Sequence, residues 1–218
     1  MAKRSIRERL RRRLVIMAKA PQAGRVKSRL SRDIGTTAAT NFYRHTLAAV
    51  TGRLARDTRW HTLLSIAPAT ALHGRNLPPG LSRLAQSSGD IGQRMQAIFD
   101  QPFVGPVVVV GSDIPEMHPT HIAAAFDALA NHDAVFGPAV DGGFWLVGLK
   151  RSPRVIAAFG EVRWSSPTTL QDCLEGLGGY RVATVSCLRD VDEAADLTHL
   201  RGNWGRRIVP VDCKNSRW

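Results

Sequence analysis

Residues 14–30, LVIMAKAPQAGRVKSRL, hold the pattern that decides the fold, because an apolar run breaks there into a cationic loop. The run at 14–18 is typical of a buried strand. In the loop behind it, Gly24 permits close backbone approach. Two interpretations stay open: the loop is a solvated basic turn, or, in an extended segment, side chains at alternate positions converge on one diphosphate. The cationic residues of the loop are Lys19, Arg25, Lys27 and Arg29.

The rest of the chain alternates apolar runs with segments of helical spacing. Strands are predicted at 14–18, 60–67, 81–86, 106–115 and 180–188, with a strand pair around a glycine-rich turn at 133–150. Helices are predicted at 36–56, 90–100, 119–131, 166–177 and 193–201. This alternation predicts a largely parallel sheet with helices on both faces, which binds ligands at the carboxyl ends of its strands.

Length and charge predict one domain between two basic ends. The 218 residues, 44% of them hydrophobic, suffice for a single core, expected at 14–201. Of the net charge of +12, +6 falls on the N-terminal arm at 1–13, +4 on residues 201–218 and +2 on the rest. Arms such as 1–13 and the tail at 202–218 are usually solvated, so nucleic acid is an unlikely partner and binding through the arms remains the alternative from another class.

The cysteines, and the lack of long apolar runs, favour a soluble cytoplasmic protein. Cys173, Cys187 and Cys213 are far apart with no CxxC pair, so neither a zinc site nor a disulfide framework is indicated and reduced thiols are expected. The apolar run after Arg13 is too short for a signal peptide, and no run reaches membrane-spanning length.

A second polar cluster follows the run PVVVV, which delivers Ser112 and Asp113 to the edge of the sheet. A carboxylate beside such an apolar strand is costly unless it is paired or bound to metal. Mg²⁺ typically takes one or two carboxylates together with substrate phosphates, which suits Asp113 opposite the basic loop. The other interpretation is that Asp113 caps a helix or forms a turn before Pro115.

A third cluster sets Asp141 before Gly142 and Gly143, with Phe144 and Trp145 behind them. The glycines could form a hairpin turn only. In the functional interpretation they leave room for a substrate beside Asp141, and an aromatic side chain forms a wall. Trp164 either borders the same pocket or packs under a loop.

Several familiar motifs are missing from the sequence. It contains neither a GxGxxG fingerprint, nor a GxxxxGK[ST] loop, nor a GxSxG elbow. His118 and His121 lack a nearby Glu or Cys at zinc spacing, so a helix start is the better interpretation of them. Dinucleotide binding of the Rossmann type, a Walker site and a serine hydrolase are thus disfavoured.

Five motifs in order carry a resemblance: MAKAPQAGRVKSRL (17–30), GDIGQRM (89–95), GSDIPEM (111–117), GPAVDGGFWLVGL (137–149) and DVDEAADL (190–197). Together they resemble the DUF2064 or arsenosugar-biosynthesis-type glycosyltransferase family of bacteria. The chain is more distantly similar to nucleotidyltransferases that make molybdenum-cofactor dinucleotides and to phospholactate guanylyltransferases. The resemblance implies a GT-A-like nucleotide-diphospho-sugar transferase fold, a Rossmann-like three-layer α/β/α sandwich with a mixed central sheet.

The resemblance also implies roles for single residues. Asp113 and Asp141 would be catalytic, and Asp113 would hold Mg²⁺ or Mn²⁺ with Asp190 or, as second choice, Asp192. By the functional interpretation of the third cluster, and not by the resemblance, substrate would contact Gly142, Gly143, Phe144 and Trp164. The nucleotide would contact Ala18, Lys19, Pro21, Gly24, Arg25, Lys27, Arg29, Asp90, Arg94 and Ser112, with Lys27 and Arg29 on its phosphates.

The sequence therefore predicts a metal-dependent transferase with a nucleotide-activated donor, foremost a nucleotide-sugar glycosyltransferase. The cation and the basic loop would neutralise charge on the leaving diphosphate. The alternative is a nucleotidyltransferase, because the same groups would bind an NTP and release pyrophosphate. The expected partners are a nucleotide sugar or NTP and a small-molecule acceptor, and a homodimer stays open.

Overall fold

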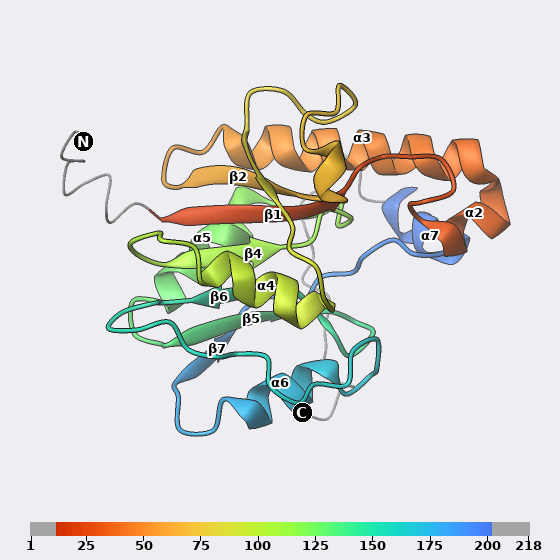
Figure 1. Ribbon diagram of the computed structural model, residues 1–218. Coiled ribbons are helices and arrows are strands. Elements are labelled where there is room, and N and C mark those ends of the chain that lie inside the picture. Colours follow the sequence, from red (N-terminus) through yellow and green to blue (C-terminus); the bar gives the residue numbers. More distant parts are fainter. Residues whose placement is uncertain (1–11, 202–218) are drawn as a thin grey trace.

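The computed structural model describes residues 12–201, and a mixed seven-stranded sheet forms its centre (Figure 1). Across the sheet the strands are β3 (Ser82–Ala85), β2 (His61–Ala67), β1 (Arg13–Lys19), β4 (Val107–Val110), β6 (Phe144–Leu149), β5 (Ala134–Pro138) and β7 (Val182–Thr184). Strand β6 runs antiparallel to both β4 and β5, whereas the other pairings are parallel. The predicted mixed sheet is confirmed.

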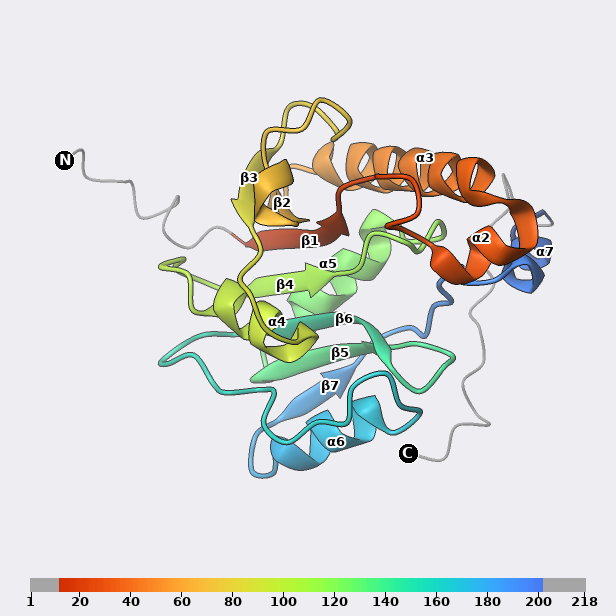
Figure 2. The same cartoon turned by 45° about the vertical axis from the view of Figure 1, so that its right-hand side comes forward.

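Helices cover both faces of this sheet (Figures 1 and 2). Side chains of α3 and α5 pack on one face, and those of α4 and α6 pack on the other. The predicted three-layer α/β/α sandwich is confirmed. The helices are α2 (Ser28–Ile34), α3 (Thr36–Ala55), α4 (Ile91–Phe99), α5 (Pro119–Ala128), α6 (Thr169–Gly176) and α7 (Ala194–Arg201), with a 3-10 turn η1 (Ala69–Ala71).

The continuous apolar run of β1 reflects burial on both faces of the sheet. Leu14 and Ile16 join the core under α3 and α5, whereas Val15 and Met17 join the core under α4 and α6. Successive side chains of a strand point to opposite faces, so a strand covered on both sides needs apolar residues throughout. The strand can then end abruptly in polar residues at the sheet edge, where the site lies.

Helix α2 was not predicted from the sequence. The expectation that residues 25–29 form one extended segment is wrong, because Lys27 has left-handed backbone angles (φ 49°, ψ 50°) and Ser28 begins α2. Lys27 and Arg29 nevertheless meet at one carboxylate, that of Asp192, at 2.9 and 3.4 Å. Arg25 and Arg29 are exposed, and the side chain of Lys27 is only 5% exposed.

Few of the expectations about the two ends fall on described residues. Within the arm predicted at 1–13, Arg13 belongs to β1 and Arg12 pairs with Asp127 at 3.0 Å; the rest of that arm and the tail at 202–218 lie outside the described residues. Cys173 is a buried free thiol, whereas Cys187 is disulfide-bonded, so the expectation of reduced thiols is wrong for Cys187. Among the helices of residues 12–201, none combines the length and the apolar character needed to cross a membrane.

Candidate functional site

A cavity of about 700 Å³ opens where β1 and β4 end. Met17 of β1 and Val109 of β4 line it, and the polar residues that follow these strands form its rim. Because parallel strands end at the same edge of a sheet, segments distant in sequence meet there.

Three carboxylates meet at this edge. Asp113, Asp190 and Asp192 each offer an oxygen, and these oxygens all lie within 4.8 Å of one another. Asp113 follows β4. Asp190 and Asp192 lie in the segment after β7, just behind Leu188, which forms an isolated β-bridge with Ala139. Carboxylate oxygens are the ligands that Mg²⁺ and Mn²⁺ favour. We refer to Asp113, Asp190 and Asp192 as the carboxylate cluster.

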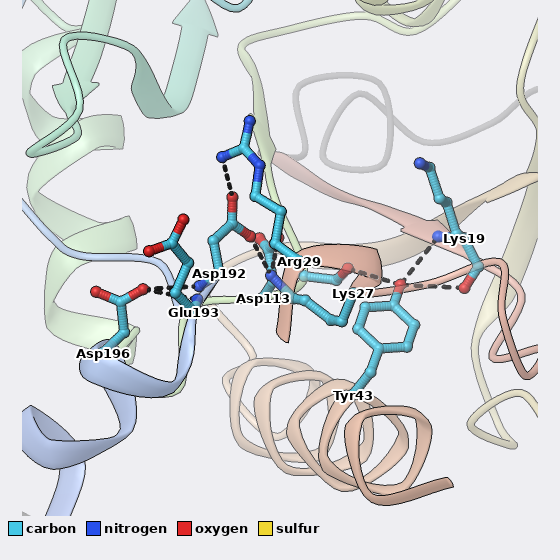
Figure 3. A network of polar contacts seen from close by, with 9 residues as sticks. Lys19, Lys27, Arg29, Tyr43, Asp113, Asp192, Glu193 and Asp196 are labelled. Carbon is cyan, nitrogen blue, oxygen red and sulfur yellow. Dashed lines mark hydrogen bonds and ion pairs between the residues drawn. The ribbon is translucent and has the colours of Figure 1, made fainter. Parts of the chain in front are cut away.

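The ammonium of Lys27 contacts this cluster (Figure 3). Its Nζ donates to Asp113 Oδ2 at 2.8 Å and to Asp192 Oδ1 at 2.9 Å. Burial of Lys27 opposes its charge, but the two carboxylates outweigh that effect, so its pKa is raised above the ordinary value. Arg29 is 65% exposed and reaches Asp192 Oδ2 at 3.4 Å, a longer and weaker contact.

The negative charge of the cluster is only partly compensated. The pKa of Asp190 is raised to about 6, first by burial and then by the nearby carboxylates of Asp192, Asp113 and Asp141, against the effect of Lys27. A divalent cation would relieve both the burial cost and the repulsion. The three carboxylates thus fit a hard cation, and here the Lys27 ammonium provides the positive charge beside two of them.

Hydrogen bonds from α7 fix the position of Asp192. Asp196 Oδ2 accepts from the backbone N–H groups of Asp192 and Glu193 at 3.0 Å each (Figure 3). The N–H of Ala194 donates to Asp33 of α2 at 3.0 Å, which ties α7 to α2. Helices α2 and α7 lie side by side in both views of the fold (Figures 1 and 2). The two helices therefore hold Lys27 and Asp192 facing each other.

The hydroxyl of Tyr43 on α3 links the ends of β1 and β4. It accepts from Lys19 N–H and donates to the Lys19 carbonyl, both at 3.0 Å, and lies 3.1 Å from Ser112 Oγ. Burial raises the pKa of Tyr43, so the group stays a neutral phenol at neutral pH. Tyr43 thereby places the cationic loop beside the segment that carries Asp113.

We expect Tyr43→Phe to lower the free energy of unfolding by about 1–2 kcal/mol, because the Lys19 N–H and carbonyl lose their partner. Urea denaturation measures this change. Tyr180→Phe removes an exposed phenol and serves as the matched control, with an expected change within about 0.5 kcal/mol. Equal changes in the free energy of unfolding for the two substitutions would show that the hydrogen bonds of the Tyr43 hydroxyl do not stabilise the fold.

The turn between β5 and β6 forms the opposite rim of the cavity. Asp141 Oδ1 accepts from Gly143 N–H at 2.9 Å, and Gly142 has a φ of 86°. The turn is thus a hairpin, and Asp141 and Gly143 also line the cavity, while contact with a substrate stays a prediction. The wall behind the turn is aromatic, with the Phe144 and Trp164 rings 6.4 Å apart.

Most predicted site residues line the cavity, namely Ala18, Lys19, Lys27, Arg29, Arg94, Ser112, Asp113, Asp141, Gly143, Phe144, Trp164 and Asp190. Five lie outside the lining. Gly24 and Arg25 are exposed, and Pro21 and Gly142 are buried. Asp90 caps α4, where its Oδ1 accepts from Gln93 N–H at 2.8 Å.

Other lining residues were not predicted. Gln86 donates to the carbonyls of Ala18 and Ser65, at 3.3 and 2.9 Å, and so holds the end of β1. The periodicity of residues 36–56 predicted the helix that carries Tyr43, but not that Tyr43 reaches the site. Further unpredicted lining residues are Ile91, Met95, Ser165, Ser166, Pro167 and Thr169.

Comparison with known proteins places the chain among transferase folds. The sequence profile of one family, described as "Uncharacterized protein conserved in bacteria (DUF2064)", matches residues 46–166. A Desulfovibrio desulfuricans protein, whose proposed identity is a nucleotide-diphospho-sugar transferase, is 29% identical with a TM-score of 0.80, over 89% of this chain and 88% of that one. Among curated proteins, no sequence matches the chain.

Two more distant structures share the fold. The CMP:2-keto-3-deoxy-manno-octonic acid synthetase complexed with CTP is 12% identical with a TM-score of 0.56, over 88% of this chain and 97% of that one. Rv0371c of Mycobacterium tuberculosis, in complex with manganese, is 16% identical with a TM-score of 0.51, over 88% and 99%. The comparisons confirm the expected family and the expected fold.

Proposed function

The chain belongs to the DUF2064 family, and we propose that it is a divalent-metal-dependent transferase whose donor is a nucleotide sugar. The observation that carries this proposal is the carboxylate cluster, with oxygens within 4.8 Å of one another, beside Lys27 and Arg29 in one cavity. The similarity to the Desulfovibrio protein supports the nucleotide-sugar donor, and the manganese complex of Rv0371c supports the metal.

In this proposal the cluster holds Mg²⁺ or Mn²⁺, which when bound supplies positive charge to the diphosphate that leaves with the nucleotide. Lys27 and Arg29 donate to phosphate oxygens, and charge-assisted hydrogen bonds of this kind are about twice as strong as neutral ones. Helices α2 and α7 hold Lys27 beside Asp192 before the donor binds, so Lys27 needs little reorientation when phosphate arrives.

Asp141 is proposed to face the acceptor or the sugar. It is exposed, and its Oδ1 is held by Gly143 N–H, while its second oxygen remains available to accept from a hydroxyl group. Phe144 and Trp164 offer apolar faces beside it. A small-molecule acceptor, a homodimeric state and a cytoplasmic location stay predictions from the sequence.

Nucleotidyl transfer is the second candidate. It is favoured by the fold shared with the CTP-bound synthetase. The same cluster and cations would bind an NTP, and the product would be pyrophosphate instead of a nucleoside diphosphate. The two reactions therefore differ in what leaves, not in the residues that hold the phosphates.

A thermal-shift screen tests the proposal. Nucleoside diphosphates, triphosphates and nucleotide sugars are each added with and without Mn²⁺. A ligand present at a hundredfold excess over its Kd stabilises the fold by about 2.7 kcal/mol, a shift that is easily measured. Stabilisation by nucleotide sugars and diphosphates supports glycosyl transfer, and a preference for triphosphates favours nucleotidyl transfer. No metal-linked stabilisation by any nucleotide would contradict both.

A further inference from the structure

Lys27 occupies the place among the carboxylates that a metal ion would need. Two of the three N–H donors of its ammonium are used on Asp113 and Asp192, at 2.8 and 2.9 Å. The Lys27 side chain is 5% exposed, whereas the side chains of Asp113 and Asp192 are 34% and 39% exposed. Lys27 is thus the most desolvated member of this ion-pair network and depends on its partners for compensation.

The backbone of Lys27 is also unusual. Its φ of 49° and ψ of 50° lie in the left-handed region, which few residues other than glycine adopt. Strained backbone of this kind persists where the surrounding structure enforces it, often at ligand sites. At Lys27 the strain accompanies a side chain that is anchored by two ion pairs.

A divalent cation would compete with Lys27 for the same oxygens. If the metal takes Asp113 and Asp192, the buried ammonium loses both partners and faces a second positive charge, which is costly. A diphosphate entering with the metal would give Lys27 new anionic acceptors. Metal and diphosphate should therefore bind together more tightly than each binds alone.

We propose that Lys27 is a place-holding cation, which competes with the divalent metal for Asp113 and Asp192 and transfers to the donor diphosphate when the metal binds. This inference rests on the proposed function for the metal and the diphosphate. It adds that Lys27 opposes metal binding alone and favours the joint complex. Such coupling is reciprocal between the two ligands.

Calorimetric titration with Mn²⁺ alone tests the competition. Lys27→Met should bind Mn²⁺ about tenfold more tightly than the unchanged protein, within the range of about 5–150-fold typical of such coupling. Arg29→Met is the matched control, since it removes the same charge from a contact to Asp192 but at an exposed position. It should change the affinity much less. If Lys27→Met does not purify, Lys27→Gln replaces it.

The premixed Mn²⁺–pyrophosphate complex is the second probe, and the expected effect of Lys27→Met has the opposite sign. Affinity for it should fall about tenfold, because a charge-assisted phosphate contact is lost. Unchanged or weaker binding of Mn²⁺ alone by the Lys27→Met protein would overturn the place-holder role while leaving the proposed function intact. If neither protein binds Mn²⁺ in any form, the proposed function fails and this inference fails with it.

Discussion

Asp113→Asn is expected to lower the affinity for Mn²⁺ at least about 100-fold. Loss of a residue that only hydrogen-bonds to a metal ligand already costs up to about 100-fold, and loss of a ligand should cost no less. Asp113 belongs to the carboxylate cluster, and the substitution keeps its shape while removing its charge. Addition of Mn²⁺ should strengthen nucleoside diphosphate binding in the unchanged protein and have little effect in the mutant. Calorimetry with and without Mn²⁺ measures both quantities.

Asp141→Asn is the matched control for this prediction. Asp141 lines the same cavity but lies outside the cluster, so Mn²⁺ affinity should stay within about a factor of two, since exposed charges are screened. Loss of transfer with intact Mn²⁺ binding would fit the proposed role of Asp141 at the acceptor. An equal metal effect in the Asp113→Asn and unchanged proteins would move the metal away from Asp113 and remove the main support for the proposed function.

Much of the fold could be predicted because its strands are buried on both faces. The runs at 14–18 and 106–110 are apolar throughout, and both are central strands of the sheet. Helix α2 was missed because its exposed face is polar and basic, and Leu30 is its one buried residue. Without an apolar stripe, a seven-residue helix gives no periodic signal.

The site could be predicted in part for the same reason. The carboxyl ends of the strands brought Asp113 to the basic loop, and the family resemblance added Asp190. What the sequence could not give were contacts set by helix placement. The pairing of Lys27 with Asp192 depends on α2 and α7 meeting although they are far apart in sequence, through the hydrogen bond from Ala194 N–H to Asp33, 161 residues away.

Gly142→Ala is expected to destabilise the fold by about 2–4 kcal/mol, the sum of a left-handed backbone penalty and a steric clash. Gly142 has a φ of 86°, and an added Cβ would lie 2.1 Å from the carbonyl oxygen of Pro167. The clash is with backbone, and the N–H of Leu170 also donates to the Gly142 carbonyl at 3.1 Å. The turn that carries Asp141 is therefore locked to the start of α6.

Two further alanine substitutions separate the backbone penalty at Gly142 from the steric clash. Gly24→Ala meets open space at a φ of 72°, so it should show only the backbone penalty of about 1–2 kcal/mol. Gly143→Ala would approach only the Asp141 carboxylate, at 3.2 Å, and that side chain can rotate away. Urea denaturation should thus show a much larger loss of unfolding free energy for Gly142→Ala than for Gly24→Ala or Gly143→Ala. If Gly142→Ala costs no more than Gly24→Ala, the two segments are not locked, and Asp141 would have to be positioned by the acceptor itself when it binds.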